Sequence, residues 1–426
     1  MKHSWKITIF LVLLLNIIGS FRNISYDAAV GRVIWDPNWA KIFLITCFAL
    51  LLSRIHLKEK EKHPQYLKWL LFGDAPSGKR IRYLDDLRLF AVLSVILVHV
   101  LSRSGVISGS MFTEGRFSSD ILHVVVSCLL FCNPLFIMLS GALLLPVQEE
   151  SALVFYRKRL TKVLIPAFLY GASYPILIRG FSATFQGALS APMEQLRLFM
   201  ADTPHFWLIY LILGLYLITP LLRILLKHLS AGGSWMLLLT ILLAGTGNLG
   251  NALGLWHWNL AFLWVSWIGI FLWGFFLISE TPRPLPALAL PAGILAFLCS
   301  VAIFLWKPEA SNNWYYTSAV SLLVCGGLFQ GLRRRQEALE RRSDRLPRRS
   351  AFRRILEPAA VVIRKYSFSI LIIHWYVLYY IVEKQFGLTF GVILPFLLTL
   401  FFSLVFAFVL DNTIVFVFLH AKSLKK

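Results

Sequence analysis

The feature that most restricts the fold is a succession of apolar segments, each long enough for a helix that crosses a bilayer, which needs about 20 residues. We count about twelve such segments in the 426 residues, at approximately residues 5–21, 39–55, 84–102, 122–146, 163–180, 205–227, 234–252, 259–279, 286–306, 314–331, 367–387 and 389–419. A soluble domain is excluded because 58% of the residues are hydrophobic and only 15% are charged, whereas globular chains average about 45–50% apolar and about 25% charged residues. The sequence therefore predicts an all-α integral membrane protein with about twelve transmembrane helices.

Charge placement predicts the orientation of these helices. The chain has 42 Lys and Arg against 21 Asp and Glu, which in a soluble protein would suggest a nucleic-acid partner but in a membrane protein indicates topology. Most of the cations lie in alternate loops and in the two tails, and the opposite loops hold only Arg22, Arg32, Arg103, Arg116, Arg179, Arg197, Lys307 and Lys384. We therefore predict that both termini and the basic loop 332–365 are cytoplasmic, in what is expected to be a bacterial inner membrane, and that no nucleic acid binds.

The cysteines and the first apolar segment say little about function. All five cysteines lie in apolar segments, and Cys128 and Cys132, one helical turn apart, have no other ligand type beside them. We therefore favour helix packing for both and predict no metal site. Lys2 and Lys6 precede the first apolar segment, which is either a signal peptide or an uncleaved anchor, and we favour the anchor.

The third apolar segment carries a polar stripe. Charges inside membrane spans are rare and commonly functional, and this segment contains Asp85, Asp86, Arg88 and His99. Arg88 and His99 are separated by three helical turns plus about 20°, so with Asp85 they share one face, with a rise of about 16 Å between Arg88 and His99. Imidazole transfers protons near neutral pH, so His99 is predicted to be a general base or a covalent acyl carrier. The alternatives are an interfacial Asp85–Arg88 ion pair and a histidine that only hydrogen-bonds a neighbouring helix.

The stretch LDDLRLFAVLSVILVH resembles the first core helix of the acyltransferase 3 family of multi-pass membrane O-acyltransferases, whose motif is an acid and an arginine followed by ten residues and a histidine. Four later stretches agree with the family in the same order: NPLFIMLSGALLL with Ser140 and Gly141, YRKRLTKVLIPAF with Arg157, Arg159 and Pro166, HFWLIYLILGLYLITPLL with His205, Trp207, Tyr216 and Pro220, and YSFSILIIH with Ser367 and His374. In this sequence Asp86 stands where glycine is usual, and Ala142 replaces a common aromatic residue.

The resemblance implies the domain organisation. Residues 82–419 would form a ten-helix membrane acyltransferase core that includes the basic loop 332–365. Residues 1–81 would add two extra helices and a basic cytoplasmic linker, and residues 420–426 would form a basic cytoplasmic tail.

The resemblance also implies transfer of an acyl group, commonly acetyl, from cytoplasmic acyl-CoA to a sugar hydroxyl of a cell-surface or lipid-linked polysaccharide. The catalytic residues would be Asp85, Arg88 and His99. The residues expected to contact acetyl-CoA are Arg157, Lys158, Arg159, Lys162, Ser140 and His374, although the basic cluster also suits a topology anchor. The residues expected to contact the sugar are Asp202, His205, Trp207 and Tyr210, although Trp and Tyr are also ordinary interfacial residues.

Two other functions remain open at this point. Twelve spans with both termini inside are also typical of transporters, including flippases for lipid-linked glycans, but no internal repeat is visible. A non-catalytic assembly subunit is a weaker alternative. For the enzyme, we expect the acyl group to reach His99 from the cytoplasm past Val92 and Ile96, and the acceptor to arrive from outside near His205 and Trp207. The partners would be membrane lipid, acyl-CoA and a glycan; the oligomeric state is not predicted.

Overall fold

The computed structural model describes residues 24–27, 32–35, 39–73, 81–104, 129–146, 150–255, 263–280, 285–306, 318–341, 351–388 and 391–420. It divides into two units, residues 1–74 with 408–426 and residues 75–407. Each unit is described by itself.

The first unit joins the two ends of the chain. It contains the antiparallel strands β1 (Ile24–Asp27) and β2 (Arg32–Trp35), and the helices α2 (Trp39–Lys62), α3 (Tyr66–Phe72) and α20 (Ile414–His420). His56 on α2 stacks on Phe416 with ring centroids 4.3 Å apart, and its Nε2 lies 2.9 Å from the carbonyl oxygen of Asn412. The hairpin departs from the predicted all-helical fold, although β-branched and aromatic residues in both strands are a local signal for it.

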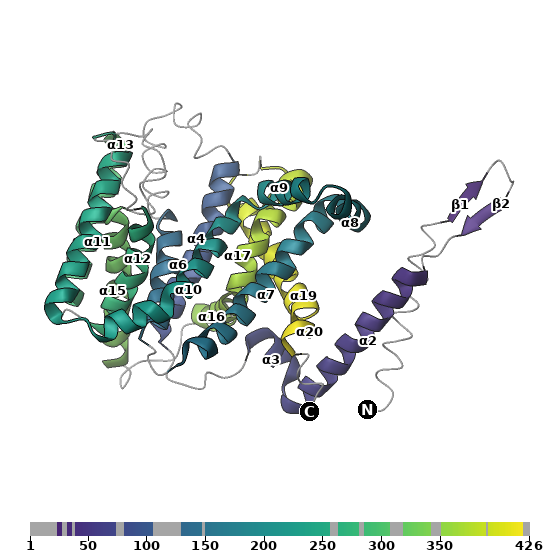
Figure 1. Cartoon of the computed structure of the whole chain (residues 1–426), viewed down its shortest axis with the longest axis horizontal. Coiled ribbons are helices and arrows are strands. Elements are labelled where there is room, and N and C mark those ends of the chain that lie inside the picture. The colour runs from purple at the N-terminus through teal and green to yellow at the C-terminus, as the bar shows by residue number, and fades with distance from the viewer. Residues whose placement is uncertain are drawn as a thin grey trace. The chain divides into compact units, whose positions relative to one another are not determined.

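The second unit is a bundle of helices (Figure 1). In chain order it contains α4 (Arg82–Arg103), α6 (Cys132–Leu144), α7 (Ala152–Arg179), α8 (Phe181–Ser190), α9 (Pro192–Asp202), the 3₁₀ turn η3 (Pro204–Phe206), α10 (Trp207–Lys227), α11 (Ala231–Ala252), α12 (Leu263–Ser279), α13 (Leu285–Trp306), α15 (Ala319–Arg341), α16 (Ala351–Lys365), α17 (Ser367–Tyr376), the π-helix η5 (Val377–Glu383), α18 (Lys384–Phe386) and α19 (Ile393–Asp411).

Five helices of the described residues are long and apolar enough to cross a membrane: Ala152–Arg179, Pro204–Lys227, Ala231–Asn251, Leu285–Ile303 and Ile393–Leu419. Helices 356–365 and 367–386 would make a sixth span if they act together across their 80° bend. This confirms an integral membrane protein built of apolar helices but not the predicted number of about twelve. The predicted span 5–21 and the first part of 122–146 lie outside the described residues. The prediction of about twelve spans also included the short helix α12 and the charged helix α4, neither of which is among the five.

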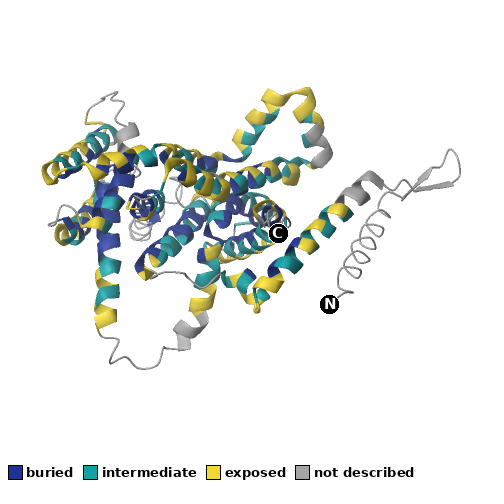
Figure 2. Cartoon of the chain, turned by 60° about the horizontal axis from the view of Figure 1, so that its bottom comes forward, coloured by how far each residue is buried: buried dark blue, intermediate teal, exposed yellow. Residues whose placement is uncertain are grey.

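The core forms where helices approach closely. Helix α6 packs on α12, and α13 packs on α15. A Cβ atom on Gly141 would lie 1.7 Å from the carbonyl oxygen of Phe271, and one on Gly274 would lie 1.9 Å from that of Met138. Small residues permit such close backbone contact between membrane helices. Figure 2 shows the buried residues on the helix sides that face one another and exposed residues on the outer sides.

Arg223 ties three helices together at one end of the bundle. From α10 its Nε and Nη2 donate to the carbonyl oxygen of Leu144 at distances of 3.0 and 2.7 Å, and its Nη1 lies 3.6 Å from Glu150. The guanidinium carbon lies 4.7 Å from the ring centroid of Phe155 on α7. These contacts set the positions of α7 and α10, the helices that carry much of the candidate site.

Candidate active site

Three histidines from distant parts of the chain meet in the second unit. His99 comes from α4, His205 from η3 and His374 from α17. The ring centroids of His99 and His374 are 5.2 Å apart, and those of His205 and His374 are 5.4 Å apart. All three line a cavity of about 80 Å³, called here the histidine cavity, whose wall also includes Asn133 and Trp207. The sequence nominated each histidine for a different role, and the structure brings them together.

Backbone carbonyls determine which nitrogen carries the proton in two of these rings. His374 Nδ1 donates to the carbonyl oxygen of Leu371 at 2.8 Å, and His205 Nε2 donates to that of Ile372 at 2.7 Å. Carbonyls only accept, so in each neutral ring the other nitrogen keeps its lone pair. Those nitrogens, His374 Nε2 and His205 Nδ1, are buried and have no hydrogen-bond partner within the described part of the chain. Each can therefore accept a hydrogen bond or a proton from a bound group.

Tyr174 on α7 supports this arrangement and was missed by the sequence analysis. Its hydroxyl donates to the carbonyl oxygen of Ile372 at 2.6 Å, accepts from the backbone N–H of Tyr376 at 3.3 Å, and lies 3.3 Å from His205 Nε2. The segment that it contacts leads directly into the π-helix η5, a distortion that often occurs at functional sites. The only signal in the sequence was that a tyrosine within an apolar helix needs a polar partner.

The other end of the polar stripe lies in a basic environment. Arg88 Nη1 is 3.9 Å from Asp85 Oδ1, which is the ion pair that the sequence offered as an alternative. Arg88 on α4 and Arg159 on α7 are both close enough to Tyr216 on α10 to act on its hydroxyl electrostatically. Helical rise places Arg88 about 16 Å from His99. Asp85 and Arg88 therefore belong to a separate region from the histidine cavity.

The basic cluster lies on the first turns of α7 and is partly neutralised. Lys158 donates to Glu150 at 2.8 Å, and this hydrogen bond holds the pKa of the Glu150 carboxyl below its ordinary value. Arg157 and Lys162 are exposed. Arg159 Nε is buried and has no partner among the residues that the structure describes. Ser140, which was expected near the acyl donor, donates its hydroxyl within α6 to the carbonyl oxygen of Phe136.

The residues expected to contact a sugar are split between three places. His205 and Trp207 line the histidine cavity. Tyr210 lines a different, larger groove. Asp202 is already paired with Arg179, whose Nη1 lies 2.6 Å from its Oδ2.

The expected acyl route along α4 also needs correction. Val92 and Ile96 have no exposed surface and do not line the histidine cavity, whereas Val95 and Val98 do. Val95 lies one helical turn before His99, so its side chain falls on the same line of the helix. Among the residues between Arg88 and His99, Val95 is therefore the one that both lines the histidine cavity and lies one turn before His99 on α4.

The family assignment agrees with this geometry. The acyltransferase domain model of the acyltransferase 3 family matches residues 81–411. The chain belongs to this family. No curated protein and no solved structure gives a match. The matched region begins one residue before α4 and contains all three cavity histidines, so this acyltransferase carries them within its membrane core.

Proposed function

We propose that this membrane acyltransferase is an O-acetyltransferase that moves acetyl from cytoplasmic acetyl-CoA to a sugar hydroxyl of a cell-surface or lipid-linked polysaccharide, in a bacterial inner membrane with both termini cytoplasmic. One observation carries the proposal: His99, His205 and His374 converge on one cavity inside the core of an acyltransferase family member. Imidazole is the usual side chain for proton transfer to and from an attacking hydroxyl.

His99 is the residue best suited to be the base. His205 and His374 are each tied to a backbone carbonyl, whereas the His99 ring makes no hydrogen bond to any described residue. In the proposed reaction His99 takes the proton of the acceptor hydroxyl as its oxygen attacks the thioester carbonyl. The C–O bond forms, the C–S bond breaks, and the leaving thiolate of CoA recovers the proton.

The size of the cavity and the position of the basic residues support a short acyl group on CoA. A cavity of about 80 Å³ has room for an acetyl group but not for a long hydrocarbon chain. The CoA phosphates cannot enter hydrocarbon without a large free-energy cost, so they suit the basic end, beside Arg157, Arg159 and Lys162. The pantetheine arm would span the gap of about 16 Å between Arg88 and His99.

Release of CoA from acetyl-CoA by the purified full-length protein with a polysaccharide acceptor tests the proposal. We expect His99→Ala to lower the rate by about 10²–10⁴, the usual contribution of an imidazole base, while the protein still accumulates in the membrane. Arg88→Lys should also lower it, because lysine keeps the charge but loses the planar guanidinium. The exposed His228, at the far end of α10 from His205, provides the matched control, and His228→Ala should keep the parent rate. A His99→Ala protein with parental CoA release would overturn the proposal.

A further inference from the structure

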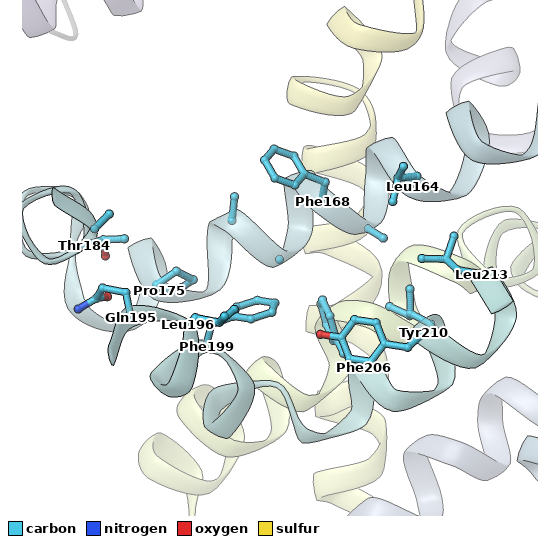
Figure 3. A pocket seen from close by; sticks show the side chains of 15 residues that line it. Leu164, Phe168, Pro175, Thr184, Gln195, Leu196, Phe199, Phe206, Tyr210 and Leu213 are labelled. Atoms are coloured by element: carbon cyan, nitrogen blue, oxygen red, sulfur yellow. The ribbon is translucent and has the colours of Figure 1, made fainter. Parts of the chain in front are cut away.

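An apolar groove lies on the side of the bundle, on helices α7 to α10. Its volume is about 480 Å³, and Figure 3 shows its lining by residues of α7 to α10. Characteristic lining residues are Phe168, Pro175, Leu196, Phe199, Phe206 and Tyr210. Phe168 is 70% exposed and Tyr210 is 51% exposed, so the groove is open at its side. Gly171 also lines it, and a Cβ there would lie 3.3 Å from the rings of Phe199 and Phe206.

This groove adjoins the histidine cavity. Ile209 lines both spaces. The consecutive residues His205 and Phe206 lie on either side of the partition, His205 in the histidine cavity and Phe206 in the groove. A molecule that is held in the groove would therefore have one end close to the candidate base.

Arg179 does not line the groove but lies on α7, the helix that contributes Phe168, Ala172 and Pro175 to it. It follows the lining residue Pro175 by one turn of α7, and its Nη1 is paired with Asp202. Its Nε and Nη2 are buried and have no hydrogen-bond partner among the described residues. The Nε–H bond and one Nη2–H bond lie parallel along one edge of the planar guanidinium, which is the geometry that binds two oxygens of one phosphate.

We propose that the groove and Arg179 bind a polyprenyl phosphate, so that the acceptor is a lipid-linked glycan that reaches the histidine cavity from the membrane. The groove lies on the membrane helices α7 and α10, where its natural content is hydrocarbon. One groove suits one long chain, and the free edge of Arg179 suits the phosphate that joins such a chain to a sugar. A free oligosaccharide would use neither feature. This inference rests on the proposed function, whose acceptor it specifies.

Photolabelling tests the inference with the full-length protein in phospholipid nanodiscs. The probe is a polyprenyl phosphate that carries a diazirine on its chain, and the reference is the matching polyprenyl alcohol, which carries the same diazirine but no phosphate, at the same mole fraction. We expect the polyprenyl probe to label peptides of α7, α9 and α10 about tenfold more strongly than the reference does, because the charged hydrogen bonds to its phosphate add affinity.

Three substitutions sharpen the test. Ala172 lines the groove and is exposed, so Ala172→Trp should fill the groove without overpacking the core and should reduce labelling to the reference level. Arg179→Lys keeps a cation beside Asp202 but loses the two-pronged edge, and should lower labelling about tenfold. Leu221→Trp, at an exposed position of α10 outside the groove, should label like the parent.

Several outcomes would overturn the inference. Equal labelling by the two lipids would mean that Arg179 does not bind the phosphate, and labelling that Ala172→Trp leaves unchanged would mean that the probe binds elsewhere. A crosslink from Ala172→Cys to residues 39–73 would mean that the chain itself covers the groove. CoA release separates this inference from the proposed function. If the protein releases CoA but is labelled equally by both lipids, the proposed function stands and the lipid-binding inference is wrong. If the polyprenyl phosphate labels more strongly but no CoA is released, the groove binds the lipid and the proposed function is wrong.

Discussion

At the scale of single residues, the three cavity histidines differ in how firmly they are held. The Ile372 carbonyl accepts from both His205 and Tyr174, and the Leu371 carbonyl holds His374. A fixed ring presents one basic nitrogen in a constant direction, which is the preorganisation that stabilises developing charge. No described residue holds His99 by a hydrogen bond, and among the described rings the His99 ring packs only against those of His374 and Trp375.

Tyr174→Phe tests whether this preorganisation matters. The substitution removes the hydroxyl that bonds Ile372 and Tyr376 but leaves the ring in place, so we expect a loss of about 1 kcal/mol of stability. We also expect kcat for acyl transfer to fall about tenfold, with KM for acetyl-CoA unchanged. Steady-state kinetics and thermal denaturation in detergent measure the two effects.

Tyr156→Phe is the matched control for that experiment. The Tyr156 hydroxyl donates to the Leu217 carbonyl oxygen at 2.7 Å, so it makes the same kind of bond at the opposite end of α7. Tyr156→Phe should lower the stability by less than Tyr174→Phe does, because the Tyr156 hydrogen bond is exposed, and it should not change kcat. An equal loss of kcat in both variants would mean that Tyr174 acts only through general stability.

At the scale of elements, the crossing of α6 and α12 depends on two glycines. Gly141 and Gly274 each face the backbone of the other helix, and a side chain at either position would collide with a carbonyl oxygen that cannot rotate away. The Ser140–Gly141 step was part of the family resemblance. In this structure Gly141 serves helix packing, and that packing holds α6, whose first turn contributes Asn133 to the histidine cavity.

Gly141→Ala is expected to destabilise the protein by about 1–3 kcal/mol or more, because the added methyl must push α6 and α12 apart. Thermal denaturation of the detergent-solubilised protein measures the loss. Gly214→Ala on α10 is the control, because a Cβ there would meet nothing within 4 Å. Gly214→Ala should leave the melting temperature unchanged or raise it slightly, because alanine has a higher helix propensity than glycine. Equal melting temperatures for the two variants would contradict the packing role.

At the scale of the whole bundle of residues 75–407, the two ends differ in charge. The backbone N–H of Tyr83 donates to Gln336 at 2.7 Å, which brings the arginine-rich end of α15 beside the start of α4. At the other end of α4, Arg103 forms an ion pair with Glu383, as Arg179 does with Asp202. These two arginines are thus paired with acids, and the positive-inside rule predicts that the basic end faces the cytoplasm.

Cysteine labelling tests this orientation. In a chain with Cys47, Cys128 and Cys299 replaced by serine, Ala338→Cys marks the basic end and Gln385→Cys marks the opposite end, and both positions are exposed. We expect an impermeant maleimide to label Gln385→Cys on intact cells and Ala338→Cys only after permeabilisation. Labelling of Ala338→Cys on intact cells would reverse the predicted topology.

Local properties of the sequence determined the class of the protein. Hydropathy over about 20 residues indicates membrane helices wherever they lie in the fold, and helical periodicity alone placed Arg88 and His99 on one face. The motif around these residues led to the acyltransferase 3 family, which the match over residues 81–411 confirms. The number of spans could not be predicted in this way. A sharp bend, such as the one between α16 and α17, decides whether two helices count as one span, and it depends on what each helix packs against.

Only the tertiary structure decided which polar residues act together. His205 and His374 lie far from His99 along the chain, and their meeting depends on the rotation and crossing of α4, α10 and α17, which no local pattern encodes. The same packing separated Tyr210 from His205 and paired Asp202 with Arg179, although all were plausible neighbours in sequence. A polar side chain in a membrane helix must find a partner, but the identity of that partner follows from how the helices are arranged.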